Sequence, residues 1–239
     1  MPTTGVFEIR SSRGATDEPP LQCQLIDDLP GVPALPETLL LMELRMSEFS
    51  VDLHEISQLI LGDLGATLQV YRLAAREHID AEDRPCRMED CISSLGLDAC
   101  LRAAAATSSA GDGCLGPIIE LWAHSREVAQ NCSELAEKSG SMSAEEAYQV
   151  GLFHGLGLLP SLLGWSSRPS FQTRTRAASR LARQWSLPAC VQQYLREDQR
   201  PGEQGPWDEI VNTAHQKARR SPVCSSPSGG LMLYVQRKL

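Results

Sequence analysis

The 239-residue sequence has few aromatic residues and no long apolar run, and each absence excludes a class of protein. Aromatic residues make up only 5% of the chain, and Ala and Leu supply most of the apolar side chains, which favours helices over a β-sandwich or barrel. The longest apolar runs, such as 39–42 and 103–106, are far shorter than the roughly 20 residues of a membrane-spanning helix. The first residues lack the apolar core and cleavage site of a secretory signal. We therefore expect a cytoplasmic protein that does not enter a membrane.

The eight cysteines include no Cys-x-x-Cys pair, which argues against a zinc ribbon or a thiol redox motif. They fall within apolar patterns, so we expect reduced core residues rather than disulfides. With 42% hydrophobic and 22% charged residues, the composition is that of a folded globular protein.

Lysine is also scarce: the chain has 19 arginines and only 3 lysines, a ratio that suggests nucleotide composition bias. The net charge of −8 is uneven, with −15 over residues 1–164 and +7 over residues 165–239. An acidic chain argues against general nucleic-acid binding, although the basic last third leaves a nucleic-acid-binding regulator open as an alternative. Charge of opposite sign in two parts of one chain also favours association with a partner or with a second copy.

Apolar residues at three- and four-residue spacing predict helices and no strands. We expect the first helix to start at Pro36 with Leu40, Leu41 and Leu44 facing inward, and Ser50 to cap the next helix. Further helices are predicted at 67–76, 89–95, 98–107, 117–139, 172–185, 188–197 and 207–219, and from Ser143, where Glu146 completes a capping box. The fold class is therefore all-α.

Connecting segments divide this pattern into parts. Residues 1–22 read as a flexible lead-in, 23–220 as one helical domain and 221–239 as a linker-like basic tail. The Gly- and Ser-containing stretch at 108–116 is the expected boundary between two lobes, at about 23–110 and 116–220.

One predicted helix, 172–185, has an apolar side and a basic side. The candidate partner surface consists of the arginines on the basic side, Arg176, Arg180 and Arg183. The simpler interpretation is that these arginines form a solvated helix face.

Histidine is the natural starting point for a chemical site. His124 and His154 face inward on successive predicted helices, where they could hold a metal ion if carboxylates were near. His54 and His78 fall at polar positions, where we expect surface residues.

Five stretches occur in order along the chain: LPGVPALPETLLLMELRMSE, LILGDLGATLQVYRLA, CISSLGLDACLRAAA, LWAHSREVAQNCSELAE and EEAYQVGLFHGLGLLP. Together they resemble the HDOD domain, the output domain of bacterial signalling proteins that is related to the HD phosphohydrolases. The resemblance covers about residues 25–218 and implies a two-lobed helical bundle.

The resemblance also implies which residues stand where HD hydrolases hold their metal. His124 matches the first His and His154 the His of the His-Asp pair, but the Asp of that pair falls on Gly155. The final Asp falls near His215 by a looser match. Without the acidic ligand we expect no metal, no cofactor and no catalytic residue. We interpret the histidines as polar core residues, with a residual three-histidine metal site or a small-ligand site left open.

The function implied is therefore a non-catalytic bacterial signalling or regulatory module that binds an unidentified signalling protein, with homo-oligomers left open. The alternatives are a metal-dependent HD-type phosphohydrolase with a rearranged site and the nucleic-acid-binding regulator named above. Bound metal would distinguish the hydrolase, and salt-sensitive binding would reveal the nucleic-acid binder.

Overall fold

The computed structural model describes residues 32–78, 85, 87–106, 115–163, 171–196 and 205–219. Within these ranges every regular element is a helix and there is no strand, which confirms the all-α prediction. No helix in the described ranges has both the length and the apolar character needed to cross a membrane.

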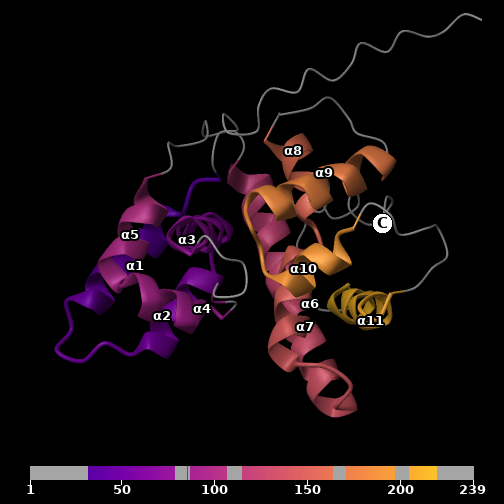
Figure 1. The fold of residues 1–239 in the computed structure, drawn as a ribbon, viewed down its shortest axis with the longest axis horizontal. Helices are drawn as coiled ribbons and strands as arrows, with labels where there is room; N and C mark the ends of the chain where they lie inside the picture. Colours follow the sequence, from indigo (N-terminus) through magenta and orange to yellow (C-terminus); the bar gives the residue numbers. More distant parts are fainter. Residues whose placement is uncertain are drawn as a thin grey trace, which may run out of the picture.

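The first five helices pack against one another as one group, on the left in Figure 1. Within this group α3 contacts α4 and α5, while α2 bridges α1 and α4. The helices are α1 (Pro36–Met46), α2 (Leu53–Leu61), α3 (Leu64–Glu77), α4 (Met88–Leu95) and α5 (Leu97–Ala105).

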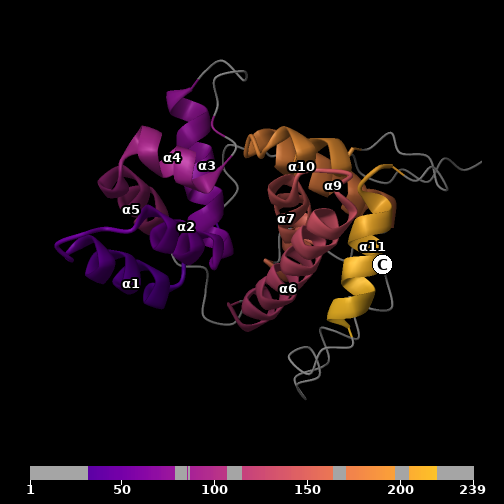
Figure 2. The same cartoon turned by 90° about the horizontal axis from the view of Figure 1, so that it is seen from below.

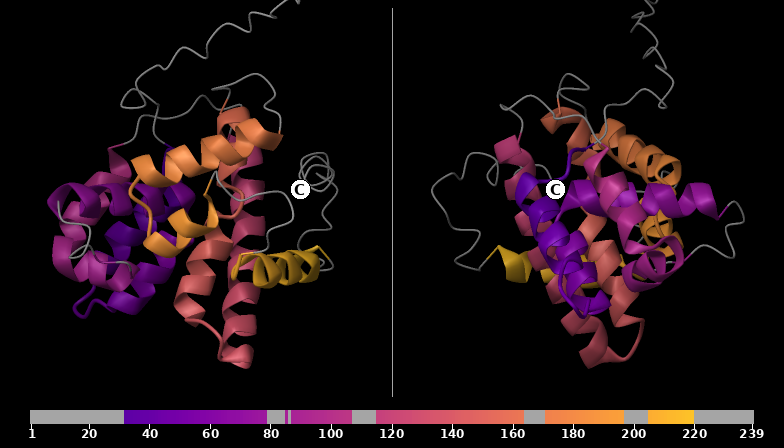
Figure 3. Two further views of the ribbon diagram at one scale, coloured as in Figure 1. Left: turned by 45° about the vertical axis from the view of Figure 1, so that its right-hand side comes forward. Right: turned by 90° about the vertical axis from the view of Figure 1, so that its left-hand side faces the viewer.

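The remaining helices form a second group around the long pair of α6 and α7, which run side by side (Figures 2 and 3). Helix α11 packs on this pair, α10 contacts α7, and α9 packs on the short 3-10 turn η2. The elements are α6 (Leu115–Ser139), α7 (Ala144–Phe153), η2 (Leu156–Leu158), α8 (Leu159–Leu162), α9 (Phe171–Gln184), α10 (Ala189–Tyr194) and α11 (Asp208–Ala218).

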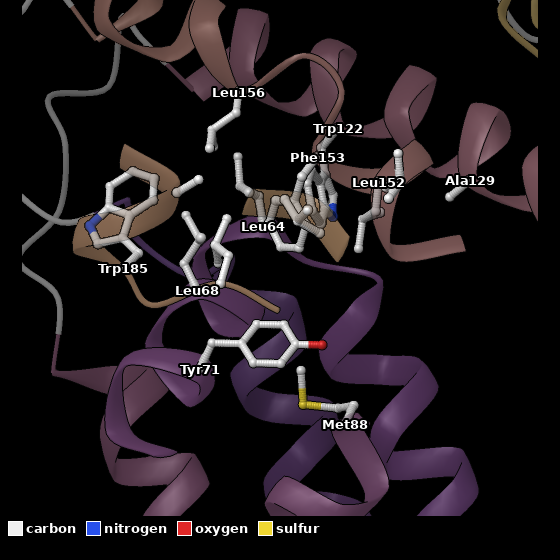
Figure 4. Close-up of a cluster of buried hydrophobic side chains, with 14 of the residues drawn as sticks. Leu64, Leu68, Tyr71, Met88, Trp122, Ala129, Leu152, Phe153, Leu156 and Trp185 are labelled. Atoms are coloured by element: carbon white, nitrogen blue, oxygen red, sulfur yellow. The ribbon is translucent and has the colours of Figure 1, made fainter. Parts of the chain in front are cut away.

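A shared apolar core joins the two groups, and Figure 4 shows α3 side chains facing those of α6 and α7. The Phe153 ring lies between Tyr71 of α3 and Trp122 of α6, with ring centroids 6.3 and 6.1 Å apart. Aromatic pairs at such spacings add to the stabilisation from burial. The core therefore fixes α3 against the α6–α7 pair.

Aspartates and a serine start three of the helices. Asp52 and Asp63 cap α2 and α3, and Ser143 caps α7 by accepting a hydrogen bond from the Glu146 amide, as predicted. The prediction that Ser50 caps α2 was wrong. Asp52 stands directly before the first helical residue, and its carboxylate accepts the His54 amide at 2.8 Å.

The predicted inward face of α1 was also wrong. Leu40, Leu41 and Leu44 are exposed, whereas Thr38 and Met42 are buried. Four consecutive apolar residues at 39–42 point to all sides of the helix, so periodicity could not identify the buried face. The packing of α1 on α2 and α5 selects the Thr38–Met42 side.

The predicted domain divisions fall largely on parts that the structure does not describe. The lead-in at 1–22, the tail at 221–239 and most of the lobe boundary at 108–116 lie outside the described residues. These divisions stay predictions.

Helices α6 and α7 pack tightly where small residues face each other. A Cβ atom on Gly151 would lie 2.7 Å from the Ala129 Cα and 3.0 Å from the Cys132 Sγ. Such distances leave no room for a methyl group, so the helix spacing depends on glycine at this position.

The variant Gly151→Ala is expected to lower the free energy of unfolding by roughly 1–3 kcal/mol, because its methyl group forces α6 and α7 apart. Gly116→Ala is the control, since a Cβ there meets nothing within 4 Å and Ala is the better helix former. Chemical denaturation of both variants measures the difference. Equal stability of the two would contradict the close helix contact.

Candidate functional site

Three histidines from three different helices meet beside the α6–α7 contact. His124 lies on α6, His154 is the C-terminal cap of α7, and His215 lies in the last turn of α11. His124 is only 2% exposed, and the other two are half-buried. The structure therefore brings together all three histidines that the family resemblance singled out.

The three rings lie edge to face around one point. Their centroids are 4.8 Å apart for His124 and His215, 5.4 Å for His124 and His154, and 5.5 Å for His154 and His215. One ring nitrogen from each histidine lies within 4.8 Å of the other two. Among the described residues this group of potential metal ligands contains no carboxylate.

Hydrogen bonds fix the tautomer of the His154 ring and connect the other two rings. His154 Nδ1 lies 2.7 Å from the Gly151 carbonyl oxygen, which can only accept, so Nδ1 carries the hydrogen. His124 Nε2 and His215 Nδ1 are 3.1 Å apart and share one hydrogen. His154 Nε2 and His215 Nε2 are buried without a hydrogen-bond partner among the described residues.

Burial keeps the imidazoles neutral. It lowers the pKa of His124 to about 3, helped by the neighbouring His154 and His215, and it lowers the pKa of His154 to about 4. The pKa of His215 is lowered too, first by burial and then by the charge of Arg219. Each ring is therefore uncharged at neutral pH and carries one nitrogen lone pair.

Gly155, where the resemblance places the lost aspartate, faces apolar side chains. A Cβ at this position would lie 3.0 Å from the Leu121 Cδ1 and 3.6 Å from the Ser125 Oγ. The same residues, with Trp122 and Phe153, line a cavity of only about 10 Å³. An ionised carboxylate here would be buried among apolar groups, which is costly without a charged partner.

The donors present therefore do not fit the ligand set of an HD hydrolase. That set combines histidines with carboxylates, which neutralise the ion and orient water, and the described cluster supplies imidazoles alone. Three neutral imidazoles fit ions of the zinc type better than magnesium or manganese.

Two polar contacts that position His215 escaped the sequence analysis. The Asn131 side-chain amide of α6 donates to the Ala214 carbonyl oxygen at 3.5 Å, and Lys217 pairs with Glu134 at 2.8 Å. Asn131 lies seven residues after His124 and therefore on the same side of α6. This helical spacing is the one sequence signal that Asn131 lies near the histidines.

The other sequence candidates lie apart from this cluster. The three arginines of the proposed partner surface are exposed on α9, opposite its buried side, as predicted. His54 is exposed and pairs with Glu89 at 2.7 Å, which confirms its surface position. His78 is half-buried and contacts the Ser94 hydroxyl at 2.7 Å.

We expect stability to fall as the pH of chelator-treated protein is lowered from about 6.5 towards 4. In that window histidine binds a proton in the unfolded chain, while the folded pKa values of His124 and His154 are lower, at about 3 and 4. Each such ring costs roughly 1.4 kcal/mol per pH unit.

The matched variant is His154→Asn, whose amide nitrogen can replace Nδ1 as the donor to the Gly151 carbonyl oxygen. Denaturant unfolding between pH 7 and 5 should give a shallower dependence for this variant than for wild type. Identical slopes would contradict the neutral, buried state of His154.

Comparison with known proteins identifies the family. The HDOD domain model matches residues 32–170, more than half of the chain. The solved structure of the MmoQ response regulator from Methylococcus capsulatus str. Bath is 17% identical, with a TM-score of 0.64 over 87% of this chain and 93% of that one. A fragment of that protein is 16% identical, with a TM-score of 0.58 over 87% and 90%.

An HDOD domain protein of unknown function from Geobacter sulfurreducens is 21% identical over 90% of this chain and 86% of that one, with a TM-score of 0.33. No curated protein matches the sequence. The likeness to the two MmoQ structures shows the fold, and the family model adds the sequence pattern. The chain belongs to the HDOD family.

Proposed function

We propose that this HDOD protein is a non-catalytic bacterial signalling module that acts through protein–protein contacts. The observation that carries this proposal is the missing carboxylate: Gly155 stands at its position, and Leu121 fills the space beside it. The name of the MmoQ relative, a response regulator, supports a regulatory role for this fold.

The rearranged-hydrolase alternative requires a group that activates water at the cluster. In HD-type sites a carboxylate helps to hold the ion and to take the proton, whereas the candidate ligands described here are three neutral rings. This difference favours binding over hydrolysis.

We predict that the full chain hydrolyses neither phosphodiesters nor phosphomonoesters above a metal-only blank. The reason is the absent carboxylate, and the assay supplies Mn²⁺, Fe²⁺ or Zn²⁺ to chelator-treated protein with chromogenic substrates of both classes. His154→Asn is the matched control for contaminating enzymes. Metal-dependent turnover that this variant abolishes would refute the non-catalytic assignment.

The α9 arginine surface supports contact with an acidic protein. Arg176, Arg180 and Arg183 are exposed on one side of α9, and Ala178 and Leu181 anchor its other side in the core. The acidic region of a second copy of this chain, net −15 over residues 1–164, has the matching charge.

We predict that partner binding or self-association weakens between low and physiological salt, because exposed charges are screened within about 8–10 Å there. The triple variant Arg176→Glu, Arg180→Glu, Arg183→Glu should remove this salt dependence and keep the fold. Sedimentation for self-association and pull-down from the native host, each at two salt concentrations, measure the effect.

The matched control places the same charge change elsewhere, as Arg76→Glu, Arg102→Glu and Arg126→Glu on α3, α5 and α6. These arginines are also exposed. If both triple variants behave alike, net charge rather than the α9 surface controls association. Binding of duplex DNA that is lost only in the α9 variant would favour the nucleic-acid alternative.

A further inference from the structure

The histidine cluster brings together three donors that the chain holds far apart in sequence. His124, His154 and His215 come from α6, α7 and α11, and one nitrogen of each lies within 4.8 Å of the others. Side-chain movements of about an ångström would bring these three nitrogens to the spacing of ligands around one ion, with metal–nitrogen bonds of roughly 2.0–2.1 Å.

The cluster also holds buried polar atoms that lack hydrogen bonds. Because His154 Nδ1 donates to the Gly151 carbonyl oxygen, its Nε2 carries the lone pair of the neutral ring. This Nε2 and that of His215 are buried with no partner in the described part of the chain. Buried nitrogens of this kind call for a water or an ion as partner.

We propose that the three histidines bind one divalent late first-row transition-metal ion of the zinc class. Neutral imidazoles suit Zn²⁺, Co²⁺ and Ni²⁺, whereas Mg²⁺ and Mn²⁺ favour carboxylate and water oxygens. This inference takes up the residual three-histidine metal site that the sequence left open, in place of the expectation of no metal that rested on the lost aspartate. It goes beyond the proposed signalling function and does not depend on it.

A metal ion at this site would cross-link three helices. Helix α11 follows a segment outside the described residues. Its described polar contacts to α6 are the His124–His215 and Asn131–Ala214 hydrogen bonds and the Glu134–Lys217 ion pair. An ion shared by His215, His124 and His154 adds a bond from α11 to both α6 and α7. Metal binding should therefore protect α11 more than the α1–α5 group.

The experiment uses the full chain, freed of metal with a chelator and titrated with Zn²⁺ or Mg²⁺ by calorimetry. We expect about one Zn²⁺ per chain, no Mg²⁺ binding, and a Tm that rises with Zn²⁺ concentration. Co²⁺ bound by the three histidine nitrogens, in a site of low symmetry, should absorb visible light intensely. Hydrogen exchange should slow in residues 208–218 when Zn²⁺ is added.

Two variants test the donors separately. His154→Asn keeps a donor to the Gly151 carbonyl oxygen but lacks Nε2, and His215→Asn removes the half-buried ring of α11. Each should weaken Zn²⁺ binding by about 100-fold or more and abolish the Co²⁺ spectrum. Circular dichroism of both metal-free variants checks that they remain folded.

His54→Gln is the control for surface binding, because His54 is exposed and pairs with Glu89 far from the cluster in sequence. It should bind Zn²⁺ like wild type. Absence of Zn²⁺ binding to wild type, or equal binding by folded His154→Asn and His215→Asn, would overturn the proposal and leave water as the occupant. Such a result would leave the phosphoesterase test of the signalling assignment unchanged.

Discussion

The tight contact between α6 and α7, at Gly151 and Ala129, is the constraint on which the histidine cluster depends. Without a side chain on Gly151, α7 lies directly against α6, and the ring of His154 three residues later reaches His124. The Gly151 carbonyl oxygen also accepts the hydrogen of His154 Nδ1 and so turns the ring. One glycine thus sets both the distance between the helices and the orientation of a donor.

The buried position of the cluster decides its chemistry. Burial lowers the histidine pKa values, so the rings are neutral and can share hydrogens or bind a cation. A carboxylate in the same place would need a cation to offset its desolvation, and Leu121 stands beside Gly155 where that carboxylate would lie. An ionised carboxylate at position 155 would therefore conflict with the apolar side chain beside it.

The two helix groups are joined mainly by apolar packing. Tyr71, Trp122 and Phe153 lie within the core shared by α3, α6 and α7. An ion pair between Arg87 and Glu145 also crosses between the groups at 3.0 Å, but both side chains are largely exposed, and such pairs contribute little. Burial of the aromatic rings therefore holds α3, and with it the first group, against the pair that carries His124 and His154.

The sequence by itself determined the helices and two members of the cluster. Helix formation is local, so the apolar spacing, the Ser143 cap and the stop at Gly96 follow from the order of the residues alone. The inward positions of His124 and His154 follow from the same periodicity. The basic, exposed side of α9 follows from it as well.

Only the tertiary structure decided what depends on contacts between distant segments. It placed His215 beside His124 across 91 residues, with Asn131 of α6 bonded to α11. It also turned Leu40, Leu41 and Leu44 outward, because the packing of α1 on α2 and α5, not its own apolar run, selects its buried face. A local pattern states which residues can be buried, but the surface of a neighbouring helix determines which of them are.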